Sequence, residues 1–557
     1  MRETLALLGL AALVGGCSTS PSNDPPGPKA PLYTNLGAYS RPITTSSADA
    51  QKYFDQGLTL SYAFNHAEAI RAFKQAASID PDCAMCYWGV AYALGPNINA
   101  PITEDAAMEA WQAIGQARQA TGADPQASVE RALIGALAKR YAPDPKAERA
   151  PLDKAYGDAM RDLVKQFPDD LDAATLFAQA LMDTSPWNYW EKDGSPRPLT
   201  PEVLSALESV IARNPNHAGA IHLYIHAVEA SPDPGRASAH ADRLAALIPG
   251  AGHIVHMPAH IYLRTGRFSQ ATQSNEDAVK ADETYFAGDV VADNMMYQVG
   301  YYPHNIHFKA TSAAFEGRSA VALEAAEAAR AKMHADMMLD PAMGGMVQHF
   351  ALTPIFMMVR FGMWDRILSE PEPAANLPYL RAIRHVARGL AHTAAGRVAD
   401  AATELAAATS LKDEAALKTL GVSNVNFASS IVAIACETLA GELAAKRRRA
   451  GDAVKHFAAA VALEDGLTYM EPPDWPIPVR ELQGAALLEI GRARDAETAF
   501  RDDMKKFPEN GWSLSGLQAA LERQGRGREA AEVKTRRDAA WRVADVGVAA
   551  GRPVVTP

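Results

Sequence analysis

The stretch YFDQGLTLSYAFNHAEAIRAFKQAASIDP, residues 53–81, decides the fold. Its spacing predicts two helices joined by a short turn, with small, aromatic and proline residues at Gly57, Ala69, Phe73, Ala76 and Pro81. Small side chains let paired helices approach closely, an aromatic ring fills the gap between them, and proline ends the second helix. The stretch therefore predicts a tightly packed helical hairpin.

These positions resemble the tetratricopeptide repeat, a hairpin of two helices. Further copies are readable at Gly266, Ala271 and Ala278; at Gly389, Gly396 and Ala401; at Gly441, Ala453, Phe457 and Ala460; at Gly484, Gly491, Ala496, Phe500 and Pro508; and at Gly525 and Ala530. No strand-like alternation competes with them. The resemblance covers most of residues 50–540 and implies an all-α fold, a right-handed superhelix of stacked hairpins.

Length and charge agree with an extended array. The chain has 557 residues, 48% of them apolar and 21% charged, which is more than one ordinary core accommodates. Its formal net charge of −11 argues against nucleic acid as a partner, since proteins that bind nucleic acids usually present a basic face. We expect three repeat regions, at 49–200 with insertions, 201–370 and 371–545, and a tail at 546–557.

The N-terminus predicts export. Arg2 precedes a short apolar stretch, and Val14-Gly15-Gly16-Cys17 resembles a bacterial lipobox. The resemblance implies a signal peptide over residues 1–17, lipidation of Cys17, and an outer-membrane lipoprotein of the cell envelope that faces the periplasm. Residues 18–48 read as a flexible tether, rich in serine and proline at their start. The alternative is a signal peptide that is cut without lipidation.

Export also affects the remaining cysteines. An oxidising compartment favours a disulfide between Cys83 and Cys86, although a Cys-x-x-Cys pair also binds metals or exchanges with thiols. Cys436 lies in an alanine-rich helical stretch and is expected to be a small buried residue.

Histidines recur at the repeat interval. His222 and His226 are followed 34 residues later by His256 and His260, and 34 residues is the length of a tetratricopeptide repeat. In that family, positions 2, 5, 9, 12 and 13 of the first helix line the concave groove. The register brings eight histidines and two charged residues to that wall: His222, His226, His253, His256, His260, His304, His307, His349, Glu229 and Arg264.

Converging imidazoles predict a metal site, because imidazole is the commonest metal ligand among side chains. A hydrogen-bonded ligand pocket and plain helix packing are the alternatives, but clustered imidazoles lower one another's pKa and cost stability unless something coordinates them. Two sets of three would form a paired centre, for instance His222, His226 and His256 with His260, His304 and His307. Pro258 and Pro354 lie inside the first helices, where they would kink the backbone near His256 and His349.

The cofactor expected is a transition metal, with copper favoured over zinc because residues 333–363 are rich in methionine. Aromatic residues near the histidines suggest a pocket wall: Trp88, Tyr92, Trp187, Trp190, Tyr301 and Tyr302. The alternative is a structural role, in which these rings attach the inserted segments to the solenoid.

Two functions follow from these patterns. The first is a metalloprotein of the envelope. If it is an enzyme, its ion would activate water or dioxygen. The second is an adaptor that binds a peptide or partner protein in a metal-free groove, which is the common role of this repeat class. The motif His-Glu-x-x-His is absent, which disfavours a zinc protease of that type.

Overall fold

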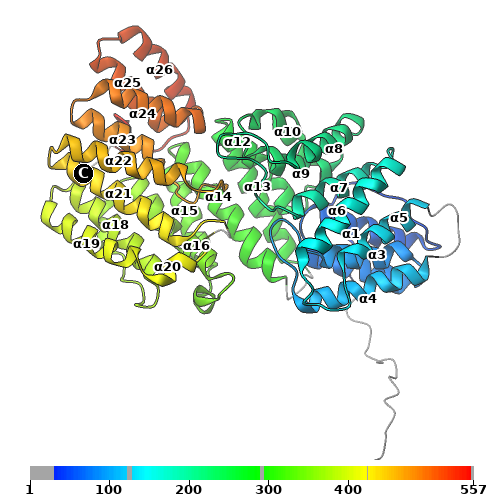
Figure 1. Cartoon of the computed structure of the whole chain (residues 1–557). Helices are drawn as coiled ribbons and strands as arrows, with labels where there is room; N and C mark the ends of the chain where they lie inside the picture. The colour runs from blue at the N-terminus through cyan, green and yellow to red at the C-terminus, as the bar shows by residue number, and fades with distance from the viewer. Residues whose placement is uncertain (1–29, 122–127, 289–293, 423–424, 554–557) are drawn as a thin grey trace, which may run out of the picture.

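The computed structural model describes residues 30–121, 128–288, 294–422 and 425–553, and there the chain is helical almost throughout (Figure 1). The strands in these ranges are β1 (Val548–Ala549) and β2 (Arg552–Pro553), which pair antiparallel. The expected all-α fold, a solenoid of tetratricopeptide-type hairpins, is confirmed. The predicted signal peptide and Cys17 lie outside the described residues.

The helices follow one another as stacked pairs. The N-terminal elements are α1 (Ala48–Tyr62), α2 (His66–Ile79), α3 (Ala84–Leu94), α4 (Glu104–Ala120), α5 (Ser128–Leu137), η2 (Ala138–Arg140), α6 (Arg149–Gln166), α7 (Leu171–Asp183) and α8 (Thr200–Arg213). The central elements are α9 (Ala218–Val228), η3 (Pro234–Ala237), α10 (Ser238–Leu247), α11 (Gly252–His256), α12 (Pro258–Arg264), α13 (Phe268–Phe286), η4 (Met296–Tyr301), α14 (Tyr302–Phe315), α15 (Ser319–Ala331), η5 (Ala335–Leu339), α16 (Gly344–Arg360) and α17 (Trp364–Ser369).

The C-terminal elements continue the same pattern. They are α18 (Pro378–Ala394), α19 (Val398–Lys412), α20 (Ala415–Thr419), α21 (Ala428–Lys446), α22 (Ala450–Asp465), α23 (Val479–Glu489), α24 (Ala493–Lys506), α25 (Gly511–Arg523) and α26 (Gly527–Ala540). The first helices of successive hairpins contact one another from α14 through α16, α18, α21 and α23 to α25. The chain also curves so far that α1 touches α9 (Figure 1).

Two buried apolar clusters form the main cores. One extends from α1 to α13, and the other from α14 to α25. Helix α14 belongs to both, because Phe308 packs into the first cluster and Ile306 into the second. The histidine-bearing helices therefore lie where the two cores meet.

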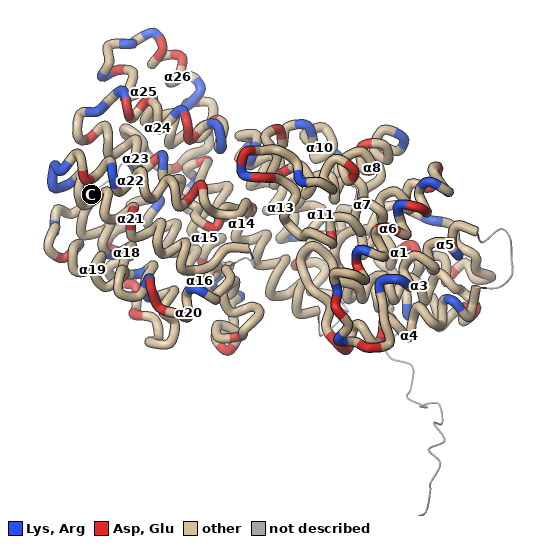
Figure 2. The backbone as a smooth tube through the Cα atoms, viewed as in Figure 1, with Lys and Arg blue, Asp and Glu red and all other residues tan. Residues whose placement is uncertain are grey.

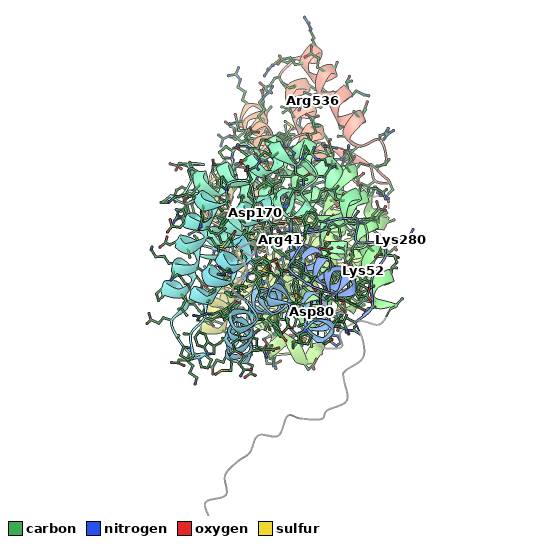
Figure 3. All side chains as sticks on the ribbon, turned by 90° about the vertical axis from the view of Figure 1, so that its right-hand side faces the viewer. Arg41, Lys52, Asp80, Asp170, Lys280 and Arg536 are labelled. Carbon is green, nitrogen blue, oxygen red and sulfur yellow. A yellow bond between two sulfur atoms is a disulfide. The ribbon has the colours of Figure 1, made fainter. Side chains whose placement is uncertain are left out.

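The N-terminal segment before α1 is fixed to the solenoid. Arg41 pairs with Asp170 at 2.7 Å and with Asp172 at 2.9 Å, and Figure 3 labels Arg41 and Asp170 side by side. The backbone N–H of Gly250 donates to the carbonyl of Asn35 at 2.8 Å. Residues 30–47 of the predicted tether thus lie against α7 and the α10–α11 connection.

Charged residues of both signs alternate over the outer helices (Figure 2). Among the described helices, α21 alone has the length and apolar composition of a membrane span. It packs against α18, α19 and α22, and 72% of its apolar window is buried, as expected for a core helix of a solenoid.

The small and aromatic positions of the repeat act as their spacing predicts. A Cβ atom on Gly57 or Gly89 would lie 2.7 Å or 2.3 Å from the Phe73 ring, so this ring fills the space between three helices. The Phe500 ring fits in the same way between Gly484 and Gly516. Glycine is required at these positions because nothing larger leaves room for the ring.

We expect Gly89→Ala to lower the free energy of unfolding by about 1–3 kcal/mol, since overpacking forces the Phe73 ring to move. The matched control is Gly115→Ala in α4, where no atom lies within 4 Å of the added Cβ. This control should stabilise by about 0.5–1 kcal/mol, because alanine has the higher helix propensity. Urea unfolding measures both, and equal effects would contradict the packing account.

Candidate metal centre

Six buried or half-buried histidines form two adjacent groups of three. The first triad consists of His222 and His226 on α9 with His253 on α11, and the second triad consists of His256 on α11, His260 on α12 and His304 on α14. Within each triad the ligand nitrogens lie within 4.8 Å of one another. The His226 and His260 rings, one from each triad, are 5.5 Å apart. Helices α9, α12, α13 and α14 are the neighbouring green helices in the middle of Figure 1.

A helix break lies between two members of the second triad. Pro258 has no N–H to donate to the preceding turn, so α11 ends at His256 and α12 begins at Pro258. His253 belongs to the first triad, whereas His256 faces His260 and His304. The grouping expected from sequence placed His256 beside His222 and His307 beside His260. The structure corrects both placements, since His253 is the third member beside His222 and His307 lies against His349.

Backbone and side-chain acceptors hold four of the six rings through Nδ1. His222 donates to the carbonyl of Tyr62 at 2.6 Å, and His226 donates to Glu229 Oε1 at 2.8 Å. His256 donates to Asn275 Oδ1 at 2.7 Å, and His260 donates to Glu229 Oε2. Because the proton of a neutral imidazole is then on Nδ1, the Nε2 atom keeps its lone pair.

The acceptor atoms in these contacts are well defined. Asn275 donates through Nδ2 to the carbonyl of Ala271 at 2.8 Å, which fixes its Oδ1 toward His256. Glu229 bridges the two triads, since each carboxylate oxygen accepts from one of them. Carboxylates and carbonyls behind imidazole are the usual outer partners of metal-binding histidines.

The Nε2 atoms of five of the six rings lie close to one another. Nε2 of His256 lies 2.8 Å from Nε2 of His260 and 3.2 Å from Nε2 of His304, while Nε2 of His222 lies 3.1 Å from Nε2 of His253. Two lone pairs at 2.8 Å repel unless a cation lies between them. Nitrogen ligands around a tetrahedral zinc ion are about 3.3 Å apart, given bonds of about 2.0–2.1 Å.

Burial keeps these imidazoles neutral. It lowers the pKa of His222, His260 and His304 to about 3 and that of His226 to about 4. Burial, together with the neighbouring imidazoles, lowers the pKa of His253 and His256 well below 6.5. A proton is therefore a poor occupant of the space between the Nε2 atoms, and a metal ion is a good one.

Two buried nitrogens of the first triad lack any hydrogen-bond partner in the described part of the chain, namely Nε2 of His226 and Nδ1 of His253. Both residues are at most 3% exposed. A buried polar atom without a partner is costly, and a coordinated ion would relieve that cost at His226.

A segment distant in sequence, with Tyr469 and Glu471, lies near Glu229. Arg264 donates to the backbone carbonyl of Glu229, and its guanidinium lies 5.2 Å from the Tyr469 ring centroid. Tyr469 donates to Glu471 at 2.6 Å, and burial raises the pKa of Glu471 to about 8. Tyr469, Glu471 and Asn275 are site residues that the sequence reasoning missed. The repeat register offered one signal, because Asn275 lies on the second helix of the hairpin that carries His256.

Aromatic rings cover both triads. Trp187 meets His226 at 5.1 Å and Tyr301 meets His253 at 4.7 Å, while Trp190 donates to the carbonyl of Ala227 at 2.7 Å. Phe308, which was not predicted, lies 5.1 Å from His256. Tyr301 ends the π-helix η4, a rare element that is frequent at functional sites.

The other three predicted wall residues lie elsewhere. Trp88 and Tyr92 stack on each other at 5.1 Å, and Tyr92 donates to Gln179. Tyr302 donates to Glu283 and packs on Phe286. As the residue after Tyr301 it points about 100° away around the helix, into the second core.

His307 and His349 form a separate pair. Their rings are 5.7 Å apart, and His349 shares a hydrogen bond of 2.8 Å with Tyr379. Pro354 lies inside α16 without ending the helix. Neither histidine is part of the two triads.

At the N-terminal end of the solenoid, Cys83 and Cys86 are joined by a disulfide at the start of α3.

Phe64 stands in a left-handed turn beside the first triad. Six hairpins have glycine with positive φ at the middle of the three-residue turn between their helices: Gly266, Gly317, Gly362, Gly396, Gly491 and Gly525. The first hairpin has Phe64 there, with φ 57°, which is strained for a residue with a side chain. Its ring lies 4.4 Å from His222 and 5.4 Å from His253.

We expect the free energy of unfolding of Phe64→Ala to be about 1 kcal/mol lower than that of Phe64→Gly, because only glycine adopts this φ without strain. Urea unfolding measures the difference. Both variants lose the same ring, so their difference isolates the backbone term. Equal stability of the two variants would contradict a strained turn.

Comparison with known proteins adds little to this geometry. No protein-family model and no curated protein matches the sequence. Among solved structures, the chain is similar to the human IFIT1 dimer with m7Gppp-AAAA, at 13% identity over 83% of this chain and 90% of that one, with a TM-score of 0.34. The Cut9-Hcn1 hetero-tetramer of APC/C matches at 12% identity over 90% and 76%, with a TM-score of 0.30. Yeast Tom70 matches at 11% over 86% and 90%, with a TM-score of 0.28. These scores carry no argument about function.

Proposed function

We propose that the two triads bind a pair of transition-metal ions and that this chain is a metalloprotein of the cell envelope. The observation that carries the proposal is the 2.8 Å separation of the His256 and His260 Nε2 atoms, with both Nδ1 protons donated elsewhere. This arrangement is repulsive without a cation and favourable with one. Three imidazoles per ion leave a coordination position open, and such an ion supplies Lewis-acid chemistry or, for copper, one-electron chemistry.

We propose copper as the preferred ion and zinc as its competitor. The donors of each triad are imidazole nitrogens, which suit copper and zinc, and Glu229 is already bonded to two histidines. The Cys83–Cys86 disulfide supports an exported protein, in line with the lipobox-like sequence at Cys17. A lipid anchor and a periplasmic location belong to the same proposal.

The adaptor alternative has less support at this site. A peptide would have to contact the histidines, yet five of the six are at most 3% exposed. Aromatic rings and the segment around Tyr469 cover them further. A partner protein bound elsewhere on the solenoid is compatible with the metal centre.

The proposal is tested by elemental analysis of the protein purified without an affinity tag. We expect about two transition-metal ions per chain after dialysis, with copper above zinc when both are supplied in equal amounts. Less than about 0.2 ion per chain after reconstitution with either metal would refute the proposal.

A further inference from the structure

We propose that the C-terminal half holds a second ligand site, for a small organic carboxylate, in a cavity around Arg360. The cavity has a volume of about 230 Å³ and lies between the first helices α16, α18, α21, α23 and α25 and the hairpin β1–β2. Its inner end is formed by Arg360, Glu481 and Trp512, all buried, and its lining includes the exposed Ala394 and Glu489. Those two exposed residues mark the mouth.

One of the three guanidinium nitrogens of Arg360 donates a hydrogen bond to another residue, and the other two do not. Nη1 donates to Glu481 Oε1 at 2.7 Å, and the guanidinium lies 4.5 Å from the Trp512 ring centroid and 5.4 Å from that of Phe315. Nε and Nη2 have no hydrogen-bond partner within residues 30–121, 128–288, 294–422 and 425–553. The side chain is only 2% exposed, so bulk water does not serve these donors.

These two free donors form one edge of the guanidinium. Nε and Nη2 carry parallel N–H groups whose spacing matches the two oxygens of a carboxylate. Leaving them unpaired in a buried position is unfavourable, and a bidentate ligand would supply the missing partners. The most direct partner is therefore a carboxylate that enters the cavity.

The acidic residues of the lining are already paired. Glu481 pairs with Arg360 itself and its Oε2 accepts from Asn510 Nδ2 at 3.2 Å, while Glu442 accepts from Arg552 Nη2 at 2.8 Å. Both carboxylates thus have partners, while Arg360 Nε and Nη2 have none in the described residues. The lining also includes the apolar side chains of Val359, Leu390, Ile477 and Leu482.

Size and cover define the ligand class. A volume of about 230 Å³ is below the range of about 300–1,000 Å³ usual for drug-sized ligands, so the carboxylate should carry a compact apolar body. The hairpin that bears Arg552 borders the cavity together with the helices and is held to α21 through Glu442. A cavity of this size, bordered on several sides, favours a free small acid over the end of a polypeptide.

Calorimetric titration of the full chain, with metal bound, tests the proposal. Benzoate and butyrate are the probes, and benzamide and butyramide are their neutral counterparts of nearly the same shape. We expect the acids to bind at least about a hundredfold more tightly than the amides, because only the acids satisfy both free donors. Equal affinity, or no binding by either acid, would overturn the proposal.

Three variants locate the binding. Arg360→Lys keeps the charge but loses the paired donors, and should weaken acid binding at least about tenfold. Ala394→Phe, at the exposed mouth, should block entry without disturbing the core. The double variant His256→Ala with His260→Ala should bind the acids normally, because neither histidine lines the cavity. Acid binding that survives Ala394→Phe but disappears in the histidine variant would place the acid on the metal and refute this site, whatever the outcome for the metal centre.

Discussion

Replacing both His256 and His260 by alanine is expected to remove one of two bound metal ions and to leave the other. These residues supply two of the three Nε2 atoms of the second triad, and His304 alone holds an ion weakly. The first triad keeps all three of its own ligands on α9 and α11. The metal content measured by elemental analysis should therefore fall from about two ions per chain to about one.

The matched control replaces histidines that the account leaves outside the centre. His385 and His456 bond to Glu404 and Glu437 on neighbouring helices, and their replacement by alanine should leave the metal content unchanged. The single variant His304→Ala guards against misfolding, because this residue is the most exposed of the six. Two ions retained in the double variant would contradict the assignment of His256 and His260 as ligands.

Acid is expected to unfold the metal-free protein steeply below about pH 6.5, the ordinary pKa of histidine. Burial lowers the pKa of these histidines, to about 3 for His222 and His260 and about 4 for His226. Between these values and about 6.5 these histidines bind more protons in the unfolded chain than in the folded chain, so their contribution to the free energy of unfolding falls as the pH falls. Each such histidine contributes up to about 1.4 kcal/mol per pH unit.

Bound metal should move this acid transition to lower pH. The ion binds neutral imidazoles in the folded state, which adds stability that protons must overcome. Urea unfolding of chelator-treated and metal-loaded protein between about pH 7.5 and 4.5 measures the effect. In the metal-free state, the double variant at His256 and His260 should show a shallower pH dependence, by about two histidines' contribution. An unchanged slope would mean that these rings do not titrate on unfolding.

The repeat architecture was predictable because it depends on local spacing. Gly57, Ala69 and Phe73 recur at intervals that a helical hairpin imposes, and Phe73 indeed fills the space beside Gly57. The histidine register likewise predicts a shared wall, since residues one repeat apart occupy equivalent places in stacked hairpins.

The grouping of the ligands depends on features that register does not contain. Pro258 breaks the helix between His256 and His260, and His253 takes the place expected for His256 beside His222, so the two triads differ from the expected sets. Tyr469 reaches Arg264 because the whole superhelix curves, which brings together residues about two hundred positions apart. No local pattern in the chain encodes such a contact, and the same holds for the ring of Phe64 against His222.

Anomalous diffraction from crystals of the metal-loaded protein tests the central claim most directly. The account predicts one ion bonded to Nε2 of His256, His260 and His304 at about 2.0–2.1 Å, and a second ion bonded to the first triad. It would be contradicted by ions bound only elsewhere, or by metal-loaded crystals in which these Nε2 atoms face one another with no anomalous peak between them.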